Sequence, residues 1–273
     1  MSVSVACVGD NCVDRYVDPP AVDQPGGNAL NVAVHVAAAG VESAYFGVVS
    51  DDVEGRLLLS AADAADVDVS GVEVRVDGRT GVTVVRISSG ERIFEREDYG
   101  VAADIRLTGS VLDQAARHEW VHATRVDDIV PGLAQLQARG VRTSYDFGEA
   151  PALDLVGAIC PHLDVAFVSA ASGDATALAR QLLDAGTRTA VVTRGSEGAV
   201  AADSAFTVEL RADDVDVVDT LGAGDALIGA YIAASVRGAN LRDALAAGTH
   251  AAGRTCTTIG AWPTTIVRGR VAS

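Results

Sequence analysis

The stretch Asp219-Thr220-Leu221-Gly222-Ala223-Gly224-Asp225 is the most informative part of this chain. It follows residues 213–218, an acidic run whose valines predict a short strand. A clear helix pattern covers residues 226–236. A glycine-rich turn before a helix directs several free N–H groups at one place, and the helix dipole also favours an anion there. This stretch therefore predicts an anion site.

Asp225 is the unexpected member of this turn, because a carboxylate repels phosphate. An acid in this position is useful where it takes a proton from the group that attacks the phosphate. The pattern therefore favours phosphoryl transfer to a hydroxyl, with Asp225 as the base. The alternative is that Asp225 only caps the helix, since Asp is a favoured N-cap residue.

A second glycine pair opens another predicted helix, in Pro25-Gly26-Gly27-Asn28-Ala29-Leu30-Asn31. This helix is expected to run to about Ala39, with Gly40 at its C′ position. Two glycines allow the backbone to approach a ligand closely. Asn31 offers a donor and an acceptor from the first turn, which suits a polyol. The alternative is a plain turn followed by an N-cap asparagine.

The two segments together resemble the paired signatures of the ribokinase (pfkB) family of carbohydrate kinases. Residues 9–14, 26–34, 161–167 and 259–262 further resemble the family members that phosphorylate fructoselysine, a sugar–amino-acid adduct. The resemblance spans nearly the whole chain. It implies transfer of a phosphoryl group from ATP, with Mg²⁺, to a primary hydroxyl of fructoselysine or a related fructosamine. A fructokinase, ribokinase or nucleoside kinase, and a non-catalytic sugar- or nucleotide-binding protein, remain alternatives.

The resemblance also implies roles for individual residues. Asp225 is the general base, and the amides of Gly222, Ala223 and Gly224 form the anion hole. The residues expected to bind the substrate are Asp14, Gly26, Gly27, Asn31 and the lid residue Arg92. Those expected to bind the nucleotide are Thr193, Gly195, Gly198 and Thr249. Asp219 matches a monovalent-cation site, where K⁺ is expected. A turn acid at Asp14, an exposed arginine at Arg92 and a packing role for Thr249 are the simpler alternatives.

One feature departs from the family pattern. Many members carry Asn-x-x-Glu after the strand that corresponds to residues 165–168, where it helps to organise Mg²⁺ and phosphate. This chain has Ser169-Ala170-Ala171-Ser172 instead. Asp146 and Asp174 are the candidates for replacing it.

Composition limits the chemistry and the partners. The formal charge is −16, which disfavours nucleic acid and anionic membranes. All 21 basic residues are arginines, so a phosphate-binding or Schiff-base lysine is excluded. Four scattered cysteines and the absence of a signal-peptide pattern predict a cytoplasmic protein with reduced thiols.

The pattern of elements predicts an α/β fold, and the resemblance makes it a ribokinase-like three-layer sandwich with a mostly parallel sheet. Strands are expected at residues 3–9, 44–49, 120–123, 141–146, 165–168 and 190–193. Helices are expected at residues 29–39, 55–65, 131–139, 151–159, 175–185, 226–236 and 244–254. Strands alternating with helices favour a parallel sheet covered on both faces.

Residues 67–100 interrupt this alternation with a predicted meander, in which Val72, Val74 and Val76 alternate with polar residues. The resemblance implies that this insertion and residues 13–18 form a small β-sheet lid over the substrate in a single domain of residues 1–273. It also implies a possible homodimer through the lid.

Overall fold

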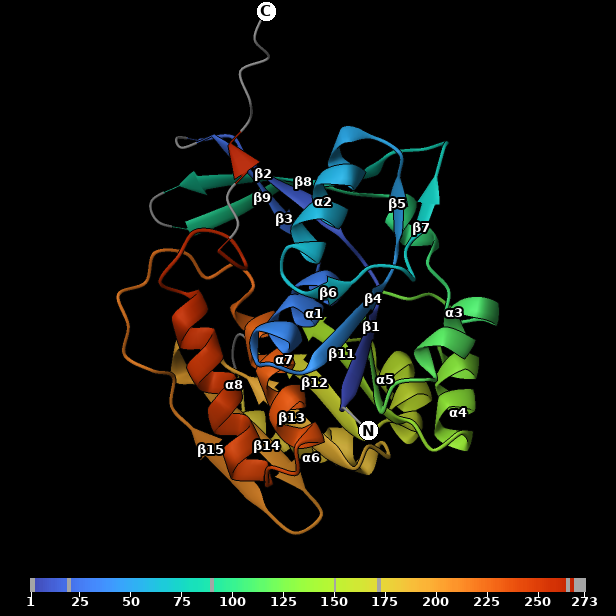
Figure 1. The fold of residues 1–273 in the computed structure, drawn as a ribbon. Helices are drawn as coiled ribbons and strands as arrows, with labels where there is room; N and C mark the ends of the chain where they lie inside the picture. Colours follow the sequence, from blue (N-terminus) through green and yellow to red (C-terminus); the bar gives the residue numbers. More distant parts are fainter. Residues whose placement is uncertain are drawn as a thin grey trace, which may run out of the picture.

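The computed structural model describes residues 3–18, 21–88, 91–149, 151–170, 173–263 and 266–267. For residues 87, 88, 91–94, 266 and 267 this description covers the backbone alone. In the described residues a nine-stranded sheet forms the centre of the molecule (Figure 1). Its strands, in spatial order, are β15 (Thr207–Leu210), β14 (Ala199–Asp203), β13 (Thr189–Thr193), β12 (Val165–Ser169), β11 (Arg142–Glu149), β10 (Trp120–Ala123), β1 (Ser4–Val8), β4 (Glu42–Phe46) and β6 (Val67–Asp68). Only the pairs β13–β14 and β14–β15 are antiparallel.

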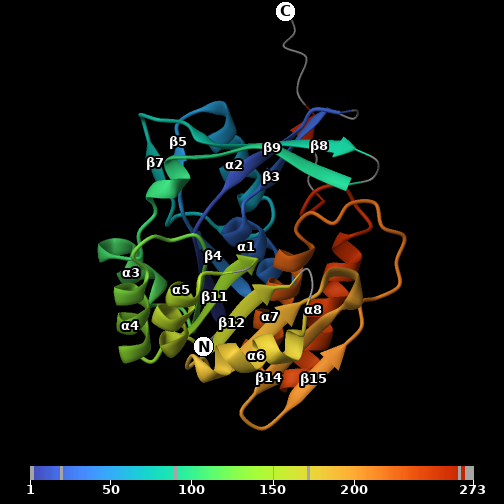
Figure 2. The same cartoon turned by 180° about the vertical axis from the view of Figure 1, so that it is seen from behind.

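Helices cover both faces of this sheet, so the expected three-layer α/β sandwich is confirmed (Figures 1 and 2). One layer contains α1 (Asn28–Ala38), α2 (Val53–Asp63), α7 (Ala223–Val236) and α8 (Leu241–Thr255). The other contains α3 (Gly109–Ala115), α4 (Val130–Ala138), α5 (Leu153–Ile159) and α6 (Ala175–Asp184). Alternate residues of the strands face the two layers, which produces two separate apolar clusters. None of these described helices is long and apolar enough to cross a membrane.

A second, smaller sheet lies beyond one end of the main sheet (Figure 1). Its order is β16 (Ile266–Val267), β3 (Val22–Gly26), β2 (Cys12–Tyr16), β8 (Thr80–Ser88) and β9 (Glu91–Gly100). β2 pairs with β3 in antiparallel and with β8 in parallel orientation. Because β2 follows β1 after only three residues, the start of the chain connects the two sheets directly.

Two expectations about strands are wrong. Residues 72–76 do not join the second sheet, because β7 (Glu73–Arg75) pairs with β5 (Val48–Ser50) in a sheet of its own. Val74 and Val76 are exposed, so their alternation does not mark a buried face. Residues 213–218 form no strand. Val217 and Val218 are also exposed, and the amide of Val218 bonds to the carbonyl of Cys256 instead of to a strand.

The order of the strands reverses beside β1. The chain first passes from β1 to β4 and β6 on one side, and then returns to β10 on the other side and continues outward to β13. In open α/β sheets, ligands bind at such a reversal, beyond the carboxyl ends of the strands. The loops that follow β1 and β10 are therefore where the topology alone places a binding site.

Candidate active site

The turn before α7 has the geometry of an anion site. Gly222 has φ 73° and stands as the N-cap of the helix, where a Cβ would lie 2.4 Å from the Cβ of Ala261. Only glycine fits this position without strain. The first-turn amides of a helix have no partner within the helix, and that of Ala223 makes only a long bond of 3.3 Å to the Thr220 carbonyl. The three predicted anion-hole residues, Gly222, Ala223 and Gly224, therefore lie together at the positive end of α7, where Gly224 is exposed and the other two are half-buried.

Asp225 lies in the first turn of α7 and is held by a side chain of α1. Asn31 Nδ2 donates to Asp225 Oδ2 at 2.7 Å, and Asn31 Oδ1 accepts from Trp262 Nε1 at 2.8 Å. An indole nitrogen only donates. Trp262 therefore fixes the oxygen of the Asn31 amide on its own side, which turns the NH₂ group toward Asp225. Asn31 and Trp262 are both buried, so water does not compete for the bond between them.

The environment of Asp225 makes its carboxylate a stronger base. Burial raises the pKa of Asp225 well above its usual value, and the negative charges of Asp146, Asp10 and Asp14 raise it further. The hydrogen bond from Asn31 opposes this rise. A carboxylate with a raised pKa accepts a proton more readily at neutral pH, as a general base must.

The predicted sugar residues lie where β2, β3 and the start of α1 meet. Asp14 is buried on β2, and a Cβ on Gly26 would lie 2.1 Å from its Oδ2 atom. Gly27 has φ 103°, and a Cβ there would lie 2.3 Å from the Cα of Asn11. Both glycines are therefore required for the close approach of residues 10–14 to the helix that carries Asn31. Asp14, Gly26, Gly27 and Asn31 are brought together, whereas the side chain of Arg92 lies outside the described residues.

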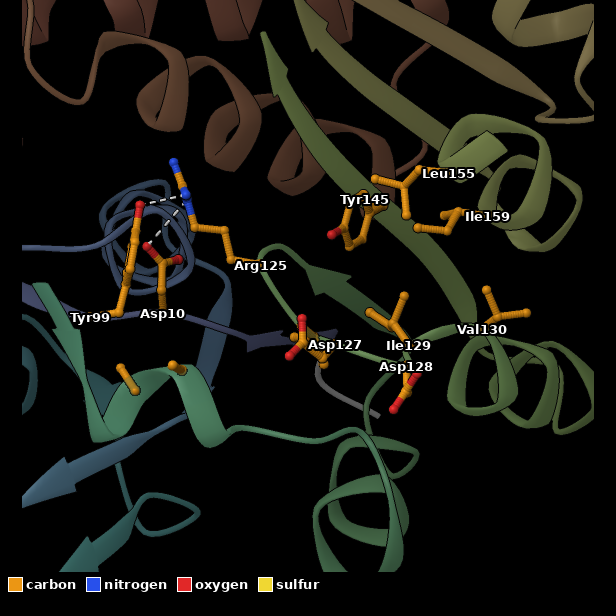
Figure 3. A pocket seen from close by; sticks show the side chains of 13 residues that line it. Asp10, Tyr99, Arg125, Asp127, Asp128, Ile129, Val130, Tyr145, Leu155 and Ile159 are labelled. Carbon is orange, nitrogen blue, oxygen red and sulfur yellow. Dashed lines mark hydrogen bonds and ion pairs between the residues drawn. The ribbon is translucent and has the colours of Figure 1, made fainter. Parts of the chain in front are cut away.

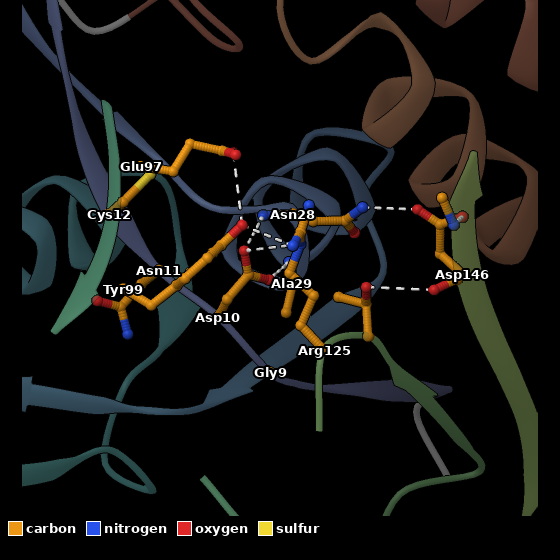
Figure 4. A network of polar contacts seen from close by, with 12 residues as sticks. Gly9, Asp10, Asn11, Cys12, Asn28, Ala29, Glu97, Tyr99, Arg125 and Asp146 are labelled. Atoms are coloured by element: carbon orange, nitrogen blue, oxygen red, sulfur yellow. Dashed lines mark hydrogen bonds and ion pairs between the residues drawn. The ribbon is translucent and has the colours of Figure 1, made fainter. Parts of the chain in front are cut away.

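A polar network that the sequence did not predict adjoins this group (Figure 4). Asp10, two residues after the end of β1, accepts hydrogen bonds from the amides of Asn28 and Ala29 at 3.3 Å each. Asn28 Nδ2 donates to Asp146 Oδ2 at 2.6 Å, and Arg125 Nε lies 3.8 Å from Asp10 Oδ2. Burial raises the pKa of Asp10 and of Asp146. In the sequence, Asp10 follows one predicted strand and Asp146 ends another, and these positions were the signal that could have identified both acids as site residues.

Asp219 connects this turn to two other segments. Its carboxylate accepts hydrogen bonds from Tyr16 Oη at 2.9 Å, from the amide of Gly260 at 2.8 Å and from the amide of Leu221 at 2.9 Å. Tyr16 belongs to β2 of the smaller sheet, and Gly260 to the loop that carries Trp262. Asp219 therefore anchors the anion-binding turn to the smaller sheet.

A cavity of about 610 Å³ opens on the other side of the turn, and all four predicted nucleotide residues line it: Thr193, Gly195, Gly198 and Thr249. Thr220, Ala223 and Gly224 line it as well, so it ends at the helix terminus next to Asp225. Gly198 has φ 97°, and a Cβ there would lie 2.1 Å from the Leu210 carbonyl oxygen, so this tight turn requires glycine. The hydroxyl of Thr249 donates to the carbonyl of Ala246 at 3.1 Å.

The two acids considered as replacements for the missing Asn-x-x-Glu pattern do not line this cavity. Asp146 binds Asn28 on the substrate side, and Asp174 caps α6 by accepting from the amides of Thr176 and Ala177. Glu149, at the end of β11, does line the cavity together with Ser169. A shift in register between residues 146 and 149 carries β11 out to this position.

Known proteins resemble this chain in sequence and in fold. Residues 5–114 and 161–265 match the family described as pfkB family carbohydrate kinase. The fructoselysine 6-kinase of Escherichia coli K12 is 34% identical over 95% of this chain and 99% of its own length. A fructosamine kinase of Bacillus subtilis 168 is 30% identical over 95% of this chain and 93% of its own. The fold matches that of an Escherichia coli protein assigned as ribokinase II, in complex with ATP and Mg²⁺, with TM-score 0.82, 19% identity and coverage of 96% and 94% of the two chains.

Proposed function

Because the chain belongs to the pfkB family of carbohydrate kinases, we propose that it phosphorylates a primary hydroxyl of a fructosamine, with fructoselysine as the first candidate and a 6-phosphate as the product. The two relatives named above act on substrates of this class. The observation that carries the proposal is the position of Asp225. Its carboxylate is hydrogen-bonded to Asn31 on the sugar side, and in the sequence Asp225 directly follows the residues whose amides border the nucleotide cavity.

The proposed reaction is an in-line transfer. Asp225 accepts the proton of the sugar hydroxyl, whose oxygen bonds to the γ-phosphorus of ATP while the bond to the bridging oxygen breaks and ADP leaves. The amides of Gly222, Ala223 and Gly224 stabilise the charge that develops on the transferred group. Asp14 and Asn31 hold the sugar hydroxyls. Because the chain has no lysine, the phosphates depend on main-chain amides and a metal for their positive environment.

We assign Mg²⁺ to the side of the nucleotide cavity that Glu149 lines. Mg²⁺ is typically held by one or two carboxylates together with substrate phosphates and water, and Glu149 offers an exposed carboxylate beside the hydroxyl of Ser169. The ion would neutralise phosphate charge there.

We place K⁺ near Asp219, where a cation would stiffen the anion-binding turn. Equal rates in K⁺ and Na⁺ would contradict that placement.

The remaining parts of the proposal concern the whole protein. The chain is proposed to form one domain in which the sheet of β2, β3, β8 and β9 is the substrate lid, because Asp14 lies on β2 and Tyr16 contacts the turn before α7. Lid strands of two copies would meet in a homodimer. Four free cysteines support a location in the reducing cytoplasm.

The test combines a substrate screen with one variant. ADP release is measured with fructoselysine, other fructosamines, fructose, ribose and adenosine, and the fructosamines are expected to react fastest. Asp225→Asn should lower turnover by about 10²–10⁴ while ATP still binds. Asp174→Asn is the matched control, since Asn also caps a helix well. Full turnover in Asp225→Asn would remove the residue from its role, and a preference for plain sugars or adenosine would refute the substrate.

Asp225→Asn also has a distinctive effect on stability. The pKa of Asp225 is raised in the folded state, so between the usual Asp pKa and this raised pKa the folded protein binds more protons than the unfolded chain. The stability of the protein therefore falls as the pH rises from the usual Asp pKa to the raised one. At neutral pH the ionised side chain is therefore destabilising. The variant should be more stable than the wild type by about 1 kcal/mol, which separates loss of the base from misfolding.

A further inference from the structure

A cavity of about 530 Å³ opens next to the sugar residues, at the point where the strand order reverses. Asp10, which follows β1, and Arg125, which follows β10, both line it (Figure 3). Asp10 also belongs to the group of acids whose charges raise the pKa of Asp225. The cavity therefore adjoins the sugar site through Asp10, and its size is in the range typical of small-molecule sites.

The walls of this cavity have two kinds of surface (Figure 3). Tyr145, Leu155 and Ile159 form an apolar wall from β11 and α5. Polar groups come from the loop between β10 and α4, with Arg125 at one end and Asp127 and Asp128 beyond it. A guanidinium and a carboxylate that flank an apolar wall match a ligand with a carboxylate, an ammonium group and an aliphatic stem.

The loop holds its two polar ends in an unusual backbone conformation. Arg125 and Asp128 both have φ 50°, which side chains other than glycine rarely adopt. Such strain persists where the surrounding structure enforces it, and it is common at ligand sites. In the described part of the chain Asp128 makes no ion pair, whereas Asp127 pairs with Arg106 at 3.4 Å.

Arg125 has N–H donors left with which it can bind a ligand. Its Nη1 atom donates to Tyr99 Oη at 2.6 Å, and its Nε atom lies 3.8 Å from Asp10 Oδ2. A guanidinium has five N–H donors, and the Arg125 side chain is 54% exposed. Tyr99 lies on β9, so the same side chain connects the smaller sheet to the loop after β10. In a chain with a net charge of −16, a ligand carboxylate needs such a local positive group.

We propose that this cavity binds the amino-acid part of the fructosamine substrate. Arg125 binds its carboxylate, Asp128 its free ammonium group, and the wall of Tyr145, Leu155 and Ile159 its aliphatic stem. This assignment rests on the proposed function, because the sugar must lie against Asp14 and Asn31 for the adduct to extend past Asp10. It makes Arg125 and Asp128 residues that determine specificity and leaves phosphoryl transfer to Asp225.

The competing explanation is structural, since Arg125 also supports Asp10 at the start of α1 and holds β9. Three synthetic substrates separate the two explanations. They are the fructose adducts of the lysine side chain, of 1,5-diaminopentane, which lacks the carboxylate, and of 6-aminohexanoate, which lacks the free ammonium group. Wild-type kcat/KM should be highest for the lysine adduct and about tenfold lower for each of the others, because a half-exposed charged contact is partly screened.

The variants complete the test. Asn tolerates positive φ, so Arg125→Asn and Asp128→Asn preserve the loop. Arg125→Asn should lose about tenfold on the lysine and 6-aminohexanoate adducts and nothing on the diamine adduct, and Asp128→Asn about tenfold on the lysine and diamine adducts only. Arg139→Asn, which removes the exposed ion pair with Asp113 on α3, is the control and should leave kcat/KM on all three adducts unchanged.

Each outcome decides the matter. Equal losses on all three adducts in Arg125→Asn would show a positioning role and overturn the proposal. Equal wild-type rates on the three adducts would overturn it while the fructosamine kinase assignment stands, and this comparison needs no variant to fold. Phosphorylation of fructose but of none of the adducts would refute the proposed function itself, and the cavity assignment with it.

Discussion

Replacing Trp262 with phenylalanine tests the chain of contacts that holds Asp225. Phenylalanine retains most of the buried ring and removes the single N–H that bonds to Asn31 Oδ1 at 2.8 Å. In the described structure this bond determines which end of the Asn31 amide faces Asp225. Without it, the Asn31 side chain loses one of its two anchors and can rotate away, and the 2.7 Å hydrogen bond to Asp225 is lost.

The size of the effect follows from these two bonds. A hydrogen bond to a charged group contributes about 1.5–3 kcal/mol, and the lower end corresponds to about tenfold in rate. We therefore expect kcat and kcat/KM on the acid side of the pH profile to fall about tenfold, because fewer molecules carry the ionised base there. Because the Asn31 bond lowers the pKa of Asp225, its loss raises that pKa further, and the base stays protonated up to a higher pH. The acid limb of the profile of kcat/KM against pH should move to higher pH.

The chain offers a matched control in Trp120→Phe. Trp120 is as buried as Trp262, and its Nε1 atom also makes one hydrogen bond, to Ser144 Oγ at 2.8 Å. Both variants should lose about 1–2 kcal/mol of stability, measured by urea unfolding. Only Trp262→Phe should change the profile in a coupled ADP-release assay. An unmoved acid limb together with the same kcat in both variants would refute the idea that Trp262 orients Asn31.

Two further predictions concern the metal and acid stability. Glu149→Gln should weaken the binding of ATP, measured by calorimetry, about tenfold in the presence of Mg²⁺ and leave metal-free ATP binding unchanged. Glu42→Gln, at the other end of the sheet, is the control. Equal weakening with and without Mg²⁺ would contradict the assignment of Mg²⁺ to Glu149. Burial lowers the pKa of His122 to about 3, so the folded state takes up fewer protons than the unfolded chain below about pH 6.5 and loses stability as pH falls. From pH 7 to about 5 the stability of His122→Asn should fall about 2 kcal/mol less than that of the wild type. Parallel curves for the two proteins would contradict the burial of a neutral His122.

The parts of the site that sequence alone predicted depend on short stretches of backbone. Gly222, Gly26 and Gly27 are glycines because a Cβ would collide with a neighbouring segment, and such positions stand out as glycine-rich turns before helices. Asp225 and Asn31 are fixed in position by the helices that those turns begin. Their pairing across 194 residues was not predicted, although both were placed in one site.

The parts that were missed depend on the arrangement of distant strands. Asp10 and Arg125 meet because β1 and β10, more than 100 residues apart, are parallel neighbours in the sheet. Trp262 was identified only as part of a resemblance, and its contact with Asn31 depends on how the loop after α8 folds back. Neither Asp146 nor Asp174, the two acids considered for the metal, lines the nucleotide cavity, and Asp174 caps α6 instead. The bulge that carries Glu149 into the nucleotide cavity has no clear sequence signal.

The proposed role of Asp225 as a base would account for the acids that surround it. Asp10, Asp14 and Asp146 each raise the pKa of Asp225 and so make it a better proton acceptor, but they also increase the repulsion of phosphate. The repulsion is offset on the opposite side of the same turn, where the amides and dipole of α7 face the nucleotide cavity. Because Gly224 and Asp225 are adjacent residues, one helix terminus would, in the proposed reaction, present a positive edge to the phosphate and a basic carboxylate to the sugar. Asn31, which Trp262 holds in place, limits the cost, since its hydrogen bond to Asp225 partly stabilises the ionised form of that carboxylate in the absence of substrate.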